Sequence, residues 1–213
     1  MDIKRFKEKP ILGILRGIKP QEIAPLVEVI ASSGLETIEI TMNTPGAPDL
    51  IRKAIQASGG RLTIGAGTVL NTEDLKLALS GGATFIVLPV FVEEVVSYCA
   101  KFKIPVFPGA LSPAEIYRAW NAGASMVKVF PANFFGPAYF KEVKAPFSGI
   151  ELLACGGVRP ENLKDFFAQG ASAVAIGAST FKREWLEAGD YLSIAKNIKS
   201  FTDQLVALEK EAL

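Results

Sequence analysis

The chain has 213 residues and a mass of 22.8 kDa, enough for one domain with a sizeable buried core. Its 23 Lys and Arg residues and 22 Asp and Glu residues give a net charge of +1, which is not the basic surface expected of a nucleic-acid or membrane binder. The chain contains no histidine, and this excludes Ser-His-Asp hydrolases, Cys-His proteases and His-ligated zinc or iron. Cys99 and Cys155 are too few for a disulfide framework or a Cys₄ site, so we expect a reducing compartment and no bound metal.

The first fifteen residues do not resemble a targeting segment. Residues 1–10 are charged throughout, and the apolar stretch 11–15 is too short for a signal peptide or a membrane span. We therefore expect a soluble, cytoplasmic protein that binds neither membranes nor nucleic acid.

Eight short apolar runs recur along the chain, with helix-length amphipathic segments such as 21–33 and 160–169 between them. The runs cover residues 11–17, 37–42, 62–69, 85–90, 105–110, 126–132, 151–157 and 173–180. Apolar strands that alternate with helices are typical of a parallel sheet covered by helices. Eight such units in this length predict an α/β fold, a (β/α)₈ TIM barrel, as a single domain over residues 1–213. The alternative is a doubly wound open sheet, which usually has fewer strands for this length.

A weak internal repeat aligns alternate strands with one another. The glycines that end the preceding helices are Gly34, Gly82, Gly123 and Gly170, each suited to a left-handed C′ conformation. Five residues after them come Glu39, Val87, Lys128 and Ala175. Interior layers of a barrel take four side chains from alternate strands, so we expect these four to form one layer with Glu39 facing Lys128. In the alternative, the two charged side chains point outward beneath the helices, where they would lose hydration without an obvious partner.

Lys128 and Glu39 are the candidate catalytic pair. Lys128 lies in the otherwise apolar run Met126–Phe130, and burial penalises the ammonium form of a lysine. The neutral amine is a nucleophile that can form a Schiff base with a ketone. In a chain without histidine, Glu39 is the natural general acid–base partner. A buried Lys128–Glu39 ion pair without any reaction fits the spacing equally well.

Two glycine turns end the seventh and eighth runs. They contain Gly156 and Gly157, and then Gly177, Ala178 and Ser179. In barrels the loops after strands seven and eight commonly bind phosphate through backbone N–H groups, and glycine permits close approach. We therefore expect a phosphate site here, with ordinary turn chemistry as the alternative.

Other residues at the strand ends give weaker signals. Arg16 could bind an anion and Thr68 a carboxylate, although such residues are more often caps or surface groups. Cys155 has no histidine to activate it, so we expect it to fill the barrel mouth. The aromatic segment 134–140 could be a flap, a subunit contact or packing for the next helix.

Together these segments resemble the class I 2-keto-3-deoxy-6-phosphogluconate (KDPG) aldolase family. The resemblance covers essentially the whole chain and is carried, in order, by Ile14-Leu15-Arg16-Gly17, Ile38-Glu39-Ile40-Thr41, Gly65-Ala66-Gly67-Thr68-Val69, Val106-Phe107-Pro108-Gly109, Val127-Lys128-Val129-Phe130-Pro131-Ala132 and Gly156-Gly157-Val158. It implies a (β/α)₈ barrel, usually a homotrimer, that needs no cofactor or metal and cleaves 2-keto-3-deoxy-6-phospho sugar acids to pyruvate and glyceraldehyde 3-phosphate.

The resemblance also assigns roles to residues. It implies Lys128 as the Schiff-base lysine and Glu39 as the acid–base group. The implied substrate contacts are Arg16, Thr68, Pro89 and Phe130, and the implied phosphate contacts are Gly156, Gly157, Gly177, Ala178 and Ser179.

The chain departs from the phosphogluconate pattern at several positions. Asn43 stands where an arginine is frequent, Cys155 where threonine is frequent, and Leu88 where serine is frequent. These features favour the 2-keto-3-deoxy-6-phosphogalactonate branch, which differs in stereochemistry at C4. Alternatives are a 4-hydroxy-2-oxoglutarate aldolase that gives pyruvate and glyoxylate, another phosphate-binding barrel enzyme, or a sugar-phosphate-binding barrel without catalysis.

Overall fold

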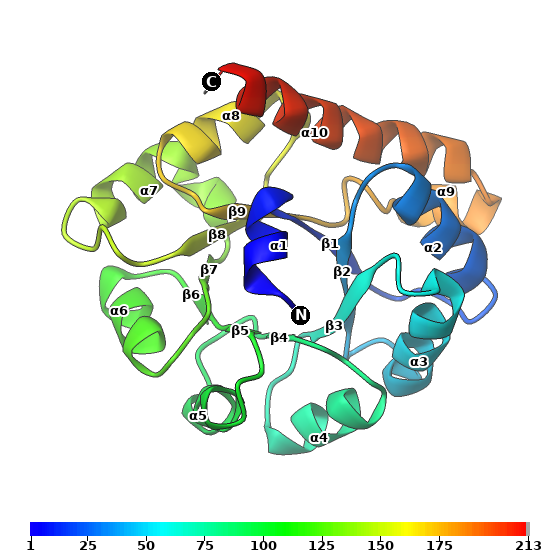
Figure 1. Ribbon diagram of the computed structural model, residues 1–213, viewed down its shortest axis with the longest axis horizontal. Helices are drawn as coiled ribbons and strands as arrows, with labels where there is room; N and C mark the ends of the chain where they lie inside the picture. The colour runs from blue at the N-terminus through cyan, green and yellow to red at the C-terminus, as the bar shows by residue number, and fades with distance from the viewer. Residues whose placement is uncertain (212–213) are drawn as a thin grey trace.

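The computed structural model describes residues 1–211, with side chains up to residue 208, as strands ringed by helices (Figure 1). The strands are β1 (Ile11–Leu15), β2 (Thr37–Thr41), β3 (Thr63–Gly67), β4 (Ile86–Val87), β5 (Val106–Phe107), β6 (Gly109–Ala110), β7 (Val127–Val129), β8 (Leu152–Cys155) and β9 (Ala173–Ile176). The helices are α1 (Ile3–Glu8), α2 (Ile23–Ser32), α3 (Ala47–Ser58), α4 (Thr72–Ser80), α5 (Glu93–Lys101), α6 (Pro113–Asn121), the 3₁₀ turn η1 (Ala132–Phe134), α7 (Gly136–Lys144), α8 (Pro160–Ala168), α9 (Arg183–Ala188) and α10 (Tyr191–Glu211).

The sheet closes into a barrel through a single proline. All strand pairs are parallel, and β5 and β6 lie at the two ends of the strand order. Only Pro108 separates these two strands, and proline has no N–H to donate to a sheet. Its carbonyl accepts the Lys128 N–H at 2.9 Å, while the Phe107 carbonyl accepts the Leu88 N–H at 3.1 Å. Residues 106–110 therefore act as one interrupted strand of an eight-stranded barrel. The predicted (β/α)₈ fold is confirmed.

The buried side chains form an outer and an inner cluster. The outer cluster lies between the strands and the helices, and the inner one fills the barrel with residues such as Phe85, Val87, Leu153 and Ala175. Space inside the barrel is short, because a Cβ on Gly65 would come within 2.6 Å of the Phe85 ring. A glycine thus makes room for a bulky ring, as packing in a narrow barrel requires.

The helix boundaries follow from local sequence signals. Ser112 begins α6 with a capping box, accepting the Glu115 N–H while the Glu115 carboxylate accepts the Ser112 N–H. The glycines expected to stop helices, Gly34, Gly82, Gly123 and Gly170, all have φ between +84° and +100°. The predicted left-handed helix stops are confirmed.

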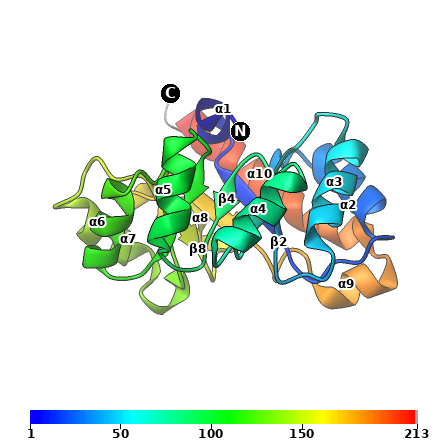
Figure 2. The same ribbon diagram turned by 90° about the horizontal axis from the view of Figure 1, so that it is seen from below.

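A feature that the sequence did not predict is α1, which lies across the centre of the ring in Figure 1 and on the opposite side of the barrel from α9 in Figure 2. Asp2 caps it by accepting the Lys4 N–H at 2.8 Å. Phe6, only 3% exposed, enters the inner cluster and stacks on Phe107 with ring centroids 5.8 Å apart. The amino end of the barrel is therefore closed.

Three contacts hold α1 to the segments that lead into strands. Arg5 pairs with Glu36, just before β2, at 2.7 Å, and Lys7 pairs with Glu151, just before β8, at 2.6 Å. The N-terminal ammonium group donates to the Thr84 carbonyl, before β4, at 3.4 Å.

Within the described chain, no helix is both long enough and apolar enough to cross a membrane.

Candidate active site

Glu39 and Lys128 both project into the barrel, from β2 and β7. Glu39 is 1% exposed and Lys128 is 6% exposed. The charge of Lys128 acts on the Glu39 carboxyl, and Val87 and Ala175 belong to the inner cluster. The four side chains of the expected layer thus all point inward, and the outward orientation of the two charged residues is excluded.

The Glu39 carboxylate is buried, and its hydrogen-bonding capacity is not fully satisfied. Its Oε2 atom has no hydrogen-bond partner among the described residues. Burial raises the pKa of Glu39 above its ordinary value, and the positive charges of Lys128 and Arg16 oppose that rise. Gly67 makes room for this carboxylate, because a Cβ there would overlap it. A carboxyl with an unpaired oxygen and a raised pKa is suited both to accept and to donate a proton.

Lys128 is held in β7 between β6 and β8, opposite Gly109 and Leu153. Its Nζ atom lies 5.4 Å from the centroid of the Phe130 ring, which is partly exposed at the strand end. Pro89 is half-buried next to this strand pair, and its carbonyl packs so closely on Gly109 that a Cβ there would overlap it. The structure therefore brings Pro89 and Phe130 to the same end of the barrel as Lys128.

Arg16 and Thr68, predicted separately, contact each other. Arg16 Nη2 donates to Thr68 Oγ1 at 3.3 Å across the ends of β1 and β3. Thr68 has φ of +55°, in the left-handed region that non-glycine residues seldom occupy. Arg16 is exposed, and its charge reaches Glu39 inside the barrel. This pair offers a guanidinium and a hydroxyl side by side at the barrel mouth.

The two glycine turns are neighbours because β8 and β9 pair, with Cys155 opposite Ala175. Gly156 and Gly157 have φ of +106° and +73°, and a Cβ on Gly157 would come within 2.6 Å of the Asn133 side chain. No acceptor in the described part of the chain pairs with the backbone N–H groups of Gly156, Gly157, Ala178 or Ser179. Unpaired N–H groups at glycine turns form a concave site suited to an anion.

Asn133 is a residue of the candidate site that the sequence did not predict. It lies on η1, directly against both glycines of the first turn. Its position could have been suspected only from its place five residues after Lys128, in the loop at the same end of the barrel.

Cys155 lies in the inner cluster beyond Leu153 on β8. Burial raises the pKa of its thiol, while the charge of Lys128 lowers it and that of Glu39 raises it. The thiol is thus kept protonated and close to the catalytic candidates, which agrees with the expected role as a small residue at the barrel mouth.

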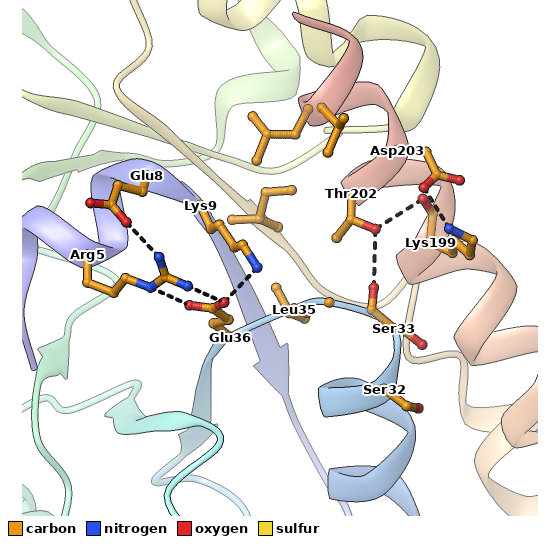
Figure 3. Close-up of a pocket in the computed structure, with 14 residues that line it drawn as sticks. Arg5, Glu8, Lys9, Ser32, Ser33, Leu35, Glu36, Lys199, Thr202 and Asp203 are labelled. Atoms are coloured by element: carbon orange, nitrogen blue, oxygen red, sulfur yellow. Dashed lines mark hydrogen bonds and ion pairs between the residues drawn. The ribbon is translucent and has the colours of Figure 1, made fainter. Parts of the chain in front are cut away.

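A hollow of about 460 Å³ lies at the other end of the barrel (Figure 3). Its charged side chains pair with one another: Glu36 with both Arg5 and Lys9, and Lys199 with Asp203. The charged side chains of this described lining are thus paired with one another and none is left for a charged ligand, so the strand-end cluster is the better candidate site.

Comparison with known proteins identifies the family of the chain. The family model described as KDPG and KHG aldolase matches residues 3–197. The 2-dehydro-3-deoxy-6-phosphogalactonate aldolase of Escherichia coli (strain K12) is 35% identical over 174 residues, which are 81% of this chain and 85% of that protein. The 2-dehydro-3-deoxy-phosphogluconate aldolase of Haemophilus influenzae is 30% identical over 94% of this chain and 95% of that protein.

Solved structures agree with the sequence relatives. A structure described as native KDPGal superposes with a TM-score of 0.88 and 31% identity, covering 94% of this chain and 96% of the other. The fold, the strand-end cluster and these relatives lead to one conclusion: the chain belongs to the KDPG and KHG aldolase family.

Proposed function

We propose that the protein is a class I aldolase that cleaves a 2-keto-3-deoxy-6-phospho sugar acid to pyruvate and glyceraldehyde 3-phosphate through a Schiff base on Lys128. The observation that carries this proposal is the buried Glu39 carboxylate, with an unpaired oxygen, in the same barrel interior as the Lys128 amine. Family membership supports the reaction class.

In the first step the neutral Lys128 amine adds to the C2 ketone of the substrate. Glu39 moves protons so that the carbinolamine loses its hydroxyl as water, and a protonated imine remains. The positive nitrogen can then accept the electron pair of the C3–C4 bond.

In the second step Glu39 takes the proton of the C4 hydroxyl. The C3–C4 bond breaks, the C4 oxygen becomes the aldehyde of glyceraldehyde 3-phosphate, and the bond pair leaves an enamine on Lys128. Glu39 returns a proton to C3, and water hydrolyses the resulting imine to release pyruvate and the free amine. Every electron pair and proton is accounted for by Lys128, Glu39 and water.

The strand-end residues hold the rest of the substrate. Arg16 and Thr68 bind the carboxylate, because their contact places a charged donor and a hydroxyl together. Pro89 and Phe130 line the path to Lys128. Backbone N–H groups of Gly156, Gly157, Gly177, Ala178 and Ser179 bind the phosphate, and this remote anchor supplies orientation.

The 6-phosphogalactonate substrate is favoured over the 6-phosphogluconate one. Asn43 and Cys155 depart from the phosphogluconate pattern, and a phosphogalactonate aldolase is 35% identical against 30% for a phosphogluconate aldolase. Cleavage of both phosphorylated epimers by one enzyme preparation, compared as kcat/KM, tests this choice.

The remaining parts of the proposal concern the whole protein. The enzyme is a cytoplasmic homotrimer that requires no cofactor or metal. Its partner is a small phosphorylated keto sugar acid, and it binds neither nucleic acid nor membranes. Turnover unchanged by EDTA supports the metal-free mechanism, whereas activity lost to EDTA and restored by Mg²⁺ would point to a metal-dependent aldolase.

Borohydride trapping is the experiment that tests the central step. Borohydride with pyruvate should reduce the imine and leave one covalent adduct on Lys128, detected by peptide mass spectrometry. Lys128→Ala should show neither adduct nor turnover, while Lys76→Ala, at an exposed lysine of α4, should retain both. Glu39→Gln should fold and lose about 10²–10⁴-fold in kcat. An unmodified Lys128 in the wild type overturns the Schiff-base mechanism and leaves the binding barrel as the alternative.

A further inference from the structure

The backbone of Gly17, the residue after Arg16, is held from two sides. Its N–H donates to Thr44 Oγ1 at 2.9 Å, and its carbonyl accepts from Arg183 Nη1 at 2.7 Å. Thr44 lies in the loop after β2, and Arg183 is the first residue of α9, which follows β9. One residue therefore links the loops that follow three strands of the barrel.

The partner on the β2 side is fixed in turn. Thr44 is 2% exposed, and its hydroxyl shares a hydrogen bond of 3.0 Å with the hydroxyl of Thr41. Thr41 is fully buried at the end of β2, two residues after Glu39. The Gly17 N–H is thus tied to the strand that carries the acid–base candidate.

The partner on the α9 side is fixed as well. Arg183 Nε donates to Glu187 Oε1 at 2.7 Å, one turn further along α9. The negative charge of Glu22, buried in the segment between β1 and α2, also acts on Arg183. Glu187 and Glu22 therefore help to orient the Arg183 guanidinium toward the Gly17 carbonyl.

These contacts act on Arg16 through the peptide bond. The Gly17 N–H lies in the peptide plane that ends at the Arg16 Cα, so fixing this N–H and the Gly17 carbonyl limits the directions in which the Arg16 side chain can leave the backbone. Gly17 has φ of +65°, a conformation that glycine adopts without strain. The Arg16 guanidinium then meets Thr68 at 3.3 Å.

We propose that Thr44 and Arg183 are positioning residues that clamp the Gly17 backbone and thereby hold Arg16 for the substrate carboxylate. The inference rests on the carboxylate contact in the proposed function. Misplacing a binding group by about 1 Å can cost roughly 10²-fold in rate, so partial loosening of the clamp should be measurable.

The test uses Thr44→Val and Arg183→Gln, with Thr44→Ser as the conservative variant that keeps the hydroxyl. Each of the first two should raise KM for the keto acid about tenfold, with kcat much less affected, and raise to a similar extent the pyruvate concentration that half-saturates borohydride trapping. Thr44→Ser should restore the wild-type KM. Thr202→Val and Arg52→Gln, on α10 and α3, are matched controls that should change neither value.

A double-mutant cycle separates positioning from general structural damage. Arg16→Gln should raise KM, and adding Thr44→Val or Arg183→Gln to it should raise KM no further, because there is no guanidinium left to position. Additive effects, or an unchanged KM in Arg16→Gln, overturn the clamp while wild-type trapping at Lys128 leaves the aldolase mechanism standing. Absence of trapping in the wild type overturns both. If Thr44→Val fails to fold, the exposed Arg183 carries the same cycle.

Discussion

Glu39 couples the protonation of one carboxyl to the stability of the barrel. Burial raises its pKa in the folded chain above the ordinary value of 4.5, so the folded state holds this proton more tightly than the unfolded state. The stability contributed by this proton is fully present below the unfolded pKa and is lost as pH rises through the higher folded pKa.

The first prediction therefore concerns pH. The free energy of unfolding of the wild type, relative to Glu39→Gln, should decrease as pH rises from about 4 to 8, because only the wild type must ionise a buried group. Urea unfolding of both proteins across this range measures the difference. Parallel pH profiles would show that Glu39 ionises as readily in the folded chain as in the unfolded one.

The second prediction concerns the two thiols. Burial raises the pKa of Cys99 to about 12 and also raises that of Cys155, so neither forms the reactive thiolate near neutral pH. In the folded protein at pH 8 neither should react with iodoacetamide within the time in which both react after unfolding in guanidinium. Mass spectrometry before and after unfolding counts the modified thiols, and rapid modification of the folded chain would contradict the prediction.

The sequence contained enough to find single residues on strands, but not contacts between loops. Glu39 and Lys128 could be aligned because the glycine at the end of each preceding helix sets the strand register. The Gly17 contacts to Thr44 and Arg183 join residues 27 and 166 positions apart. The local sequence around these residues does not predict either contact. Such contacts exist only once the barrel closes and brings its strand ends together.

At the scale of elements, α1 is the clearest departure from what the sequence predicts. Six residues are too few for a helix to be stable on its own. The helix forms because Phe6 is buried against Phe107 and because Arg5 and Lys7 pair with Glu36 and Glu151. These partners lie far away along the chain. The short, charged segment itself has no apolar periodicity from which a helix could be predicted.

The third prediction tests this helix. Phe6→Ala should destabilise the protein by about 3–5 kcal/mol, because it removes a buried aromatic ring and leaves a cavity. Denaturant unfolding measures the loss. Lys4→Ala, at an exposed position of the same helix, is the control and should change stability little. A change below about 1 kcal/mol for Phe6→Ala would mean that α1 does not seal the barrel in solution.

The elements of the barrel itself were within reach of the sequence. Each of the eight apolar runs contains a strand of the barrel, because alternation of apolar strands with amphipathic helices is a strong pattern. The break at Pro108 was not foreseen, since the run 105–110 is apolar throughout; the proline splits it into β5 and β6 without opening the sheet.

At the scale of the whole molecule, the proposed trimer calls for a surface that joins the copies. Phe134 is 75% exposed, and its neighbour Phe135 stacks on Tyr139 with ring centroids 5.1 Å apart. Tyr139 in turn donates its hydroxyl to the Leu111 carbonyl. Tyr139 thus fixes one end of this aromatic segment to the barrel while Phe134 stays exposed, which fits a subunit contact, one of the three alternatives, better than packing beneath a helix.

The fourth prediction follows from that surface. Light scattering should give a mass three times the 22.8 kDa of the chain, and Phe134→Ser should lower it at micromolar concentration. Phe102→Ser, at the exposed end of α5, serves as the matched control and should leave the mass unchanged. A monomeric wild type would contradict the trimer, and a trimeric Phe134→Ser variant would place the contact elsewhere.

Closure of the barrel floor by α1 has a consequence for the order of events. The register of β7 and β8 puts the Lys128 backbone opposite Leu153, three residues before Gly156, so β7 carries Lys128 at a deeper level than the proposed phosphate turn. The barrel is closed at its amino end by α1, and in the proposed mechanism the triose half of the substrate lies between the open end and the three-carbon fragment bonded to Lys128. We therefore expect the aldehyde to leave before pyruvate in cleavage, and pyruvate to enter before the triose in the reverse direction.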